Sequence, residues 1–139
     1  MTRYGSGPAT LSVLLAAILT SGCGSSRQLQ SVSLSPATTD AQNYSNGQVP
    51  FTATGTFSKP PSPSPLTSKD VLWCVGLSAG QCAGNINPGA TVDQNGVAQC
   101  VPAFVGTTYI MAGTAGTPTM NPDGSQPLKI FGTAQLTCP

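Results

Sequence analysis

The chain has 139 residues, a length typical of one domain with short extensions. Only 6% of the residues are charged and the net charge is +1, so the sequence lacks the clustered Lys and Arg that nucleic-acid binding requires. Hydrophobic residues make up 39%, enough to bury a core, and abundant Thr, Val, Gly and Pro favour strands joined by turns. We therefore expect an all-β domain and no nucleic-acid partner.

The N-terminal segment is apolar and ends in small side chains. Arg3 is the only charged residue among the first 26, and residues 11–20 (LSVLLAAILT) form an apolar run too short to cross a bilayer. Three small residues, at positions 20–22, then precede Cys23. This arrangement resembles the lipobox of bacterial lipoproteins, in which the signal peptide is cut before a cysteine that carries thioether-linked diacylglycerol. Position 20 is Thr where that family prefers Leu.

The lipobox resemblance implies that residues 1–22 are a signal peptide and that residues 23–30 are a lipidated tether. Several acyl chains anchor a protein firmly, because each buried CH2 adds about 0.8 kcal/mol. The protein is then expected to be exported and held in the bacterial cell envelope. Gly24 in place of Asp after the anchor favours the outer membrane where the cell has one. The alternatives are an ordinary signal peptide with an incidental cysteine and an uncleaved membrane helix.

Seven short strands are predicted from the alternation of apolar and polar side chains along the remaining chain. They cover residues 31–36, 49–57, 70–76, two stretches within 90–100, 106–113 and 128–138. The side chains expected to face inward are Val32, Leu34, Val49, Phe51, Ala53, Phe57, Val71, Trp73, Val75, Val92, Val97, Thr108, Ile110, Ala112, Leu128, Ile130, Ala134 and Leu136. Asn95-Gly96 suits a tight turn with positive φ. Loops are predicted at the proline-rich residues 59–69, the irregular link 76–89 and residues 114–127.

Cysteine pairing follows from an even count. Setting Cys23 aside leaves four cysteines in an exported chain, which predicts two disulfides among Cys74, Cys82, Cys100 and Cys138. A zinc site is the competing use, but no C-x2-C spacing and no histidine is present. Three connectivities remain open, and the short loop between the first two cysteines favours Cys74–Cys82 with Cys100–Cys138.

Seven strands separated by turns predict an immunoglobulin-like β-sandwich over residues 31–139. The segments SVSLSP, FTATGTF, VLWCV, GATVDQNGVAQC and GTTYIMA resemble the group 2 bacterial immunoglobulin-like domain. The resemblance covers roughly residues 31 to 138, and FTATGTF is its most specific part. It implies an extracytoplasmic module used in surface adhesion, in carbohydrate-associated proteins or as a spacer, with no catalytic residues to carry over.

Catalytic chemistry has little support in the composition. The chain has no histidine and no glutamate, so it lacks the groups that most often titrate near neutral pH, and we expect no enzyme activity. Ser and Lys are adjacent at Ser58-Lys59 and Ser68-Lys69, but adjacent side chains point opposite ways on an extended chain, which argues against a catalytic Ser-Lys pair. The carboxylates lie beside turns, where hydrogen bonding to the turn is expected rather than a hydrolytic pair or a calcium site; they are Asp40, Asp70, Asp93 and Asp123. No cofactor or metal is expected.

Trp73 and a group of three outward-facing apolar side chains are candidates for binding. Trp73 shares the inward phase of its strand, which predicts a core anchor, with a sugar-stacking platform as the alternative. Tyr109, Met111 and Phe131 point outward and are predicted to form an exposed binding patch, unless residues 114–127 cover it or the phase is off by one. The predicted function is a lipid-anchored, non-catalytic envelope module that binds an unidentified protein or is structural. The alternative is a carbohydrate-binding or accessory domain for polysaccharide handling.

Overall fold

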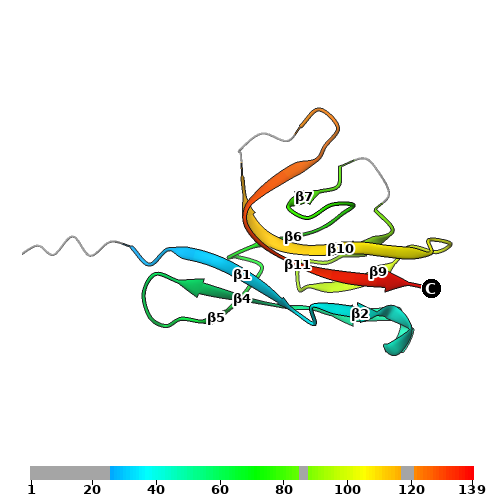
Figure 1. Cartoon of the computed structure of the whole chain (residues 1–139), viewed down its shortest axis with the longest axis horizontal. Coiled ribbons are helices and arrows are strands. Elements are labelled where there is room, and N and C mark those ends of the chain that lie inside the picture. Colours follow the sequence, from blue (N-terminus) through cyan, green and yellow to red (C-terminus); the bar gives the residue numbers. More distant parts are fainter. Residues whose placement is uncertain (1–25, 85–87, 117–120) are drawn as a thin grey trace, which may run out of the picture.

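The structure, a computed structural model, describes residues 26–84, 88–116 and 121–139 (Figure 1). The expected signal peptide and Cys23 lie outside the described residues. The elements are β1 Leu29–Ser35, β2 Thr38–Asp40, η1 Ala41–Asn43, η2 Ser45–Gly47, β3 Gln48–Pro50, β4 Thr52–Phe57, β5 Ser64–Leu66, β6 Leu72–Gly76, β7 Gln81–Cys82, β8 Ala90–Val92, β9 Val97–Cys100, β10 Gly106–Ala115 and β11 Gln126–Cys138. The η elements are short 3-10 turns.

The strands form two layers. One layer combines the sheet β1-β4-β5 with the sheet β3-β9-β8, and the other is the sheet β2-β11-β10-β6, with β7 attached to β11. Nearly all pairings are antiparallel, and β2 runs parallel to β11. The expected all-β, disulfide-stapled sandwich is confirmed. Eleven strands replace the expected seven within the described residues, because one predicted strand divides, two short strands lie in predicted loops and a third, β2, lies between the first two predicted strands.

The predicted strand 49–57 divides at Phe51. Its first part, β3, pairs with β9, and its second part, β4, pairs with β1 and β5. Between them the Phe51 N–H donates to the carbonyl of Gly96 at 2.8 Å, so the backbone leaves one sheet and enters the next without an unpaired donor. The prediction of a single continuous strand was wrong because pairing partners, which lie far away in sequence, decide where a strand ends.

The first segment of the domain also changes layers. β1 pairs with β4, and after Pro36 the chain continues as β2 along the edge of β11. β1 crosses β11 closely at Gly132, where a Cβ atom would lie 2.7 Å from the carbonyl oxygen of Val32. Only glycine allows the two backbones to come this near. This crossing brings the two layers together at the N-terminal end of the domain.

The core lies between the layers and matches most of the predicted inward set. Its buried members include Val32, Leu34, Val49, Phe51, Ala53, Val71, Val75, Ile110, Ala112, Ala134 and Leu136. Trp73, Val92 and Ile130 are partly buried and pack against this core. Three predicted members lie outside this core: Phe57 and Val97 are only half-buried, and Leu128 joins a second cluster with Cys82 and Met111 on the other side of its sheet. The β10–β11 register shifts between Gly113 and Ala115, and this bulge changes the face that Leu128 occupies.

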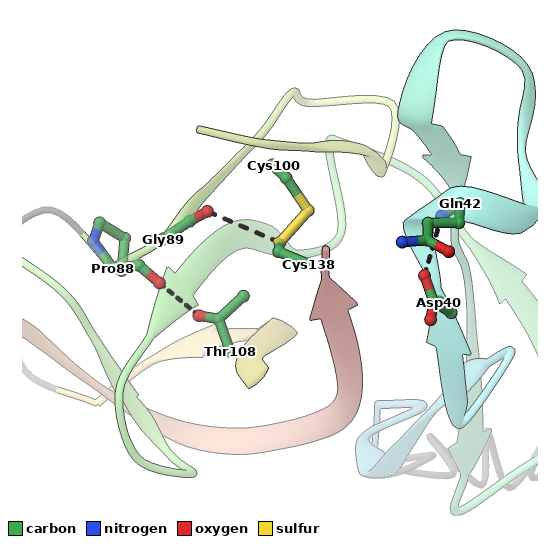
Figure 2. Close-up of a disulfide and its surroundings, with 7 residues drawn as sticks. All are labelled: Asp40, Gln42, Pro88, Gly89, Cys100, Thr108 and Cys138. Atoms are coloured by element: carbon green, nitrogen blue, oxygen red, sulfur yellow. Dashed lines mark hydrogen bonds between the residues drawn. A yellow bond between two sulfur atoms is a disulfide. The ribbon is translucent and has the colours of Figure 1, made fainter. Parts of the chain in front are cut away.

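Both disulfides have the connectivity favoured by the sequence. Cys74–Cys82 closes a separation of 8 residues and Cys100–Cys138 one of 38. The longer loop gives the second bridge the larger chain-entropy contribution, about 4 kcal/mol against about 2.5 kcal/mol. Figure 2 shows the Cys100–Cys138 bridge beside Gly89, with the buried Thr108 hydroxyl donating to the carbonyl of Pro88. The C-terminal end of β11 is therefore held by the disulfide, and the neighbouring strand β10 is held by a buried hydrogen bond from Thr108.

Candidate functional site

The expected patch of Tyr109, Met111 and Phe131 is on one face of the sheet but is not an exposed surface. The three residues lie on the outer face of β10 and β11, as predicted. Tyr109 is half-buried and Phe131 is 37% exposed, whereas Met111 is completely buried. The expectation that Met111 faces solvent was wrong.

Residues 77–82 cover Met111. The Cys74–Cys82 bridge holds this segment across the sheet, and β7 pairs with Gln126 and Pro127 of β11. The Gly80 N–H lies 3.2 Å from the Met111 sulfur and donates to it. A Cβ on Gly80 would lie 2.7 Å from the Phe131 ring, so the ring packs on the segment as well. Among the described residues, this disulfide-tied flap of residues 77–82 covers Met111.

A second candidate is a groove beside Trp73. It has a volume of about 300 Å³ and is lined by Phe51, Thr52, Ala53, Pro65, Leu66, Thr67, Ser68, Trp73, Gln94 and Asn95, a set we call the Trp73 groove. Trp73 is half-buried and packs against the core, so the predicted core role is confirmed. Its side chain also contributes to the wall of the groove. Trp73 therefore has the predicted core role and also lines a groove, and the sugar-stacking alternative stays a prediction.

One wall of the groove is a turn fixed by Asp93. Its carboxylate accepts hydrogen bonds from the backbone N–H groups of Asn95 at 2.9 Å and Val97 at 2.8 Å. These bonds, led by the one from Val97, hold the Asp93 pKa below its ordinary value. Gly96 has the positive φ predicted for this turn, +82°, and a Cβ there would lie 2.8 Å from Cζ2 of Trp73. The turn therefore lies directly against the indole.

The opposite wall is fixed by Asp70. Its carboxylate accepts from the Thr67 N–H and from the Thr67 hydroxyl, both at 2.8 Å. The backbone hydrogen bond from Thr67 is the main reason that the Asp70 pKa lies below its ordinary value. β5, which precedes this turn, lies within the proline-rich segment predicted to be only a loop, and Pro65 is accommodated because β5 is an edge strand.

All four carboxylates have the turn role predicted for them. Asp40 accepts from the Gln42 N–H at 2.9 Å (Figure 2), and Asp123 accepts from the N–H and hydroxyl of Ser125. The side-chain hydrogen bond from Ser125 lowers the Asp123 pKa. Within the described ranges, no group of three or more His, Cys, Asp or Glu side chains is placed to hold a metal ion.

The N-terminal end of the described chain is clamped onto the proline-rich segment. The Arg27 guanidinium lies 3.3 Å from the centre of the Phe57 ring and donates to the Ser64 hydroxyl at 3.0 Å and to the carbonyls of Lys59 and Pro61. Gln28 and Ser58 exchange two further hydrogen bonds. Arg27 and Gln28, four and five residues after Cys23 in the sequence, therefore contact the domain, although they lie inside the segment 23–30 predicted to be a tether.

Several residues of these sites were not anticipated from the sequence. Gln94 and Ser68 reach the groove from turns 26 residues apart, and no local pattern links them. The partial signals were the Asp residues of the two turns.

Among the described residues, no helix is long and apolar enough to cross a bilayer. No protein-family model and no curated protein sequence matches the chain.

Proposed function

We propose that this protein is a lipid-anchored, non-catalytic binding module of the bacterial cell envelope. The observation that carries the proposal is the short distance in sequence between Cys23, at the end of an apolar segment, and Arg27, which contacts a disulfide-stapled body. Two disulfides favour an oxidising, extracytoplasmic compartment. The group 2 bacterial immunoglobulin-like domain remains the family that the sequence resembles and is part of this proposal.

The anchor and the clamp together define an orientation. Four residues span at most about 14 Å when fully extended. A lipid on Cys23 therefore holds the end of the domain formed by the start of β1 and the β4–β5 connection next to the bilayer. Figure 1 shows this end on the left and the C-terminus on the right, with the η turns after β2 also on the right. The η turns and the C-terminus then face away from the membrane.

The orientation is tested with fluorophores on the lipidated protein in vesicles that contain a headgroup quencher. We expect strong quenching of a fluorophore carried by an unnatural amino acid at position 60, in the β4–β5 connection, because that connection lies beside the anchored end. We expect little quenching at position 45, in η2. Both positions are exposed.

The matched control is Cys23→Ala, which removes the acceptor of the lipid and is expected to abolish quenching at both positions. Equal quenching at positions 60 and 45 in the lipidated protein would contradict the orientation. Vesicle binding that persists in Cys23→Ala would contradict the anchor itself.

A further inference from the structure

We propose that the Trp73 groove binds a neutral saccharide. This inference deepens the proposed function as a binding module and names its ligand class, but it does not depend on the lipid anchor. It rests on the shape of the groove, on the chemistry of its lining and on the way its walls are held.

The size of the groove suits a small ligand or one unit of a longer chain. Its volume of about 300 Å³ is at the lower end of the range of about 300–1,000 Å³ usual for small-molecule sites. The apolar lining is contributed by Phe51, Ala53, Leu66 and Trp73, and the polar lining by Thr52, Thr67, Ser68, Gln94 and Asn95. An apolar surface with a few polar groups is the composition expected of a binding site.

The polar groups match a polyhydroxylated ligand. The side-chain amides of Gln94 and Asn95 each offer donors and an acceptor, and the hydroxyl of Ser68 offers both. Sugar hydroxyls also donate and accept, so each of them finds a partner in either direction. The C–H face of a pyranose ring is apolar and packs on an aromatic surface such as Trp73. All three polar residues are exposed and therefore accessible to a ligand.

Among the described residues, the lining of the groove offers no charged partner to an acidic ligand. No residue lining the groove within the described chain is ionisable. The nearest carboxylates, Asp70 and Asp93, support the two walls through Thr67 and Asn95, and both have lowered pKa values. Both carboxylates are ionised at neutral pH, and the positive charges of Arg27 and Lys69 partly offset that of Asp70. A uronate or phosphate group would find no cation in the described lining to pair with, whereas a neutral sugar needs none.

The walls are held before any ligand arrives. The carboxylate hydrogen bonds fix both turns, and the contact of Gly96 with the indole fixes the position of one wall against Trp73. A site that is already ordered loses less conformational entropy on binding. An extended peptide is the other ligand class that packs on a tryptophan, and the experiment separates it from a saccharide.

The experiment follows the fluorescence of Trp73, the only tryptophan in the chain, in the full-length mature protein. The probes are tetrasaccharides of glucose, N-acetylglucosamine and mannose, a galacturonic acid tetramer, and a proline-rich decapeptide. At least one neutral tetrasaccharide is expected to shift the emission in a saturable way. The acidic tetramer and the peptide are expected to leave it unchanged.

Gln94→Ala is the informative variant because Gln94 is exposed and its removal leaves the fold intact. We expect about tenfold weaker binding, the effect of one lost hydrogen bond, at an unchanged melting temperature. The matched control is Gln135→Ala, an exposed glutamine on β11 that does not line the groove, with unchanged affinity.

Three results overturn the proposal: no response to any neutral probe, a response equal in Gln94→Ala and wild type, or a preference for the acidic tetramer or the peptide. The same titration on Cys23→Ala separates this outcome from failure of the anchor. If the lipidated protein binds a saccharide but does not bind vesicles, the proposal for the groove is supported and only the proposal for the anchor is contradicted.

Discussion

Thr108 is a polar side chain that the core buries completely. Its hydroxyl donates to the carbonyl of Pro88 and lies 3.3 Å from the carbonyl of Gly76, so it links the chain before β8 to the end of β6. Replacing the hydroxyl by a methyl group keeps the shape and leaves both carbonyls without this partner. We expect Thr108→Val to lower the free energy of unfolding by about 1–3 kcal/mol, measured by urea denaturation.

The control for this substitution is Thr107→Val, at the neighbouring exposed position of β10. We expect it to change stability by less than about 0.5 kcal/mol. If Thr108→Val is as stable as the wild type, the buried hydroxyl does not link these segments.

Three aspartates make stability depend on acid pH. Asp70, Asp93 and Asp123 all have lowered pKa values, because turn N–H and hydroxyl groups donate to the ionised form. A carboxyl group with a lower pKa in the folded state contributes stability above its unfolded pKa, about 4, and this stability is lost as the pH falls through the folded pKa. The chain has neither His nor Glu. We expect a constant melting temperature from about pH 5 to 8 and a decrease below about pH 4.

Asp93→Asn is the matched variant for the acid decrease. Its amide oxygen still accepts from the turn but does not titrate, so the melting temperature of this variant is expected to fall less steeply below pH 4. A decrease of the wild-type melting temperature between pH 7 and pH 5 would contradict the assignment, since no aspartate of this kind titrates there.

At this scale, the sequence predicted what depends on near neighbours. The turn roles of the four aspartates follow from residues two to four positions away, as in the contact of Asp93 with Asn95 and Val97. The burial of Met111 does not, because Gly80, whose N–H donates to the Met111 sulfur, lies 31 positions away in the sequence. Alternation along β10 gives the face of Met111 correctly and says nothing about what lies on that face.

The flap of residues 77–82 is tied across the sheet by one sulfur bridge and by weaker contacts. Removing the bridge in Cys74→Ser/Cys82→Ser leaves the β7 pairing, the contact of Phe131 with Gly80 and a few hydrogen bonds, such as that from the Leu128 N–H to the Gly80 carbonyl, to hold it. We expect oxidation of Met111 by hydrogen peroxide to become roughly tenfold faster or more, because a bridge of this loop length contributes about 2.5 kcal/mol against opening. Peptide mass spectrometry measures the rate.

The native protein under the same peroxide concentration is the reference, and its Met111 is expected to remain protected. Equal rates in the two proteins would show that the disulfide does not hold the flap closed.

The division of the predicted strand 49–57 belongs to the element scale as well. The alternation of apolar and polar side chains continues across Phe51, so the sequence pattern contains no sign of a break. The break is set by competition for backbone partners between β9 and the β1–β5 pair. Similarly, the three short strands β2, β5 and β7 have too few residues to show any alternation, and tertiary pairing alone makes them strands.

For the whole molecule, composition, strand alternation and cysteine count were sufficient to predict a disulfide-stapled β-sandwich. The bridge pairing favoured by loop length, Cys74–Cys82 with Cys100–Cys138, is the one found. The Trp73 groove was not predictable, because its walls come from the β5–β6 and β8–β9 connections and meet only in the folded chain. Sequence patterns describe single strands, whereas this groove arises between them.

The central claim is that a stapled β body begins a few residues after a lipidated Cys23. Intact mass spectrometry of the protein extracted from native envelopes tests it most directly. The account predicts the mass of residues 23–139 less four hydrogens for two disulfides, increased by a diacylglyceryl group and further acylation on Cys23. A mass that retains residues 1–22, or that shows an unmodified cysteine at position 23, would contradict it.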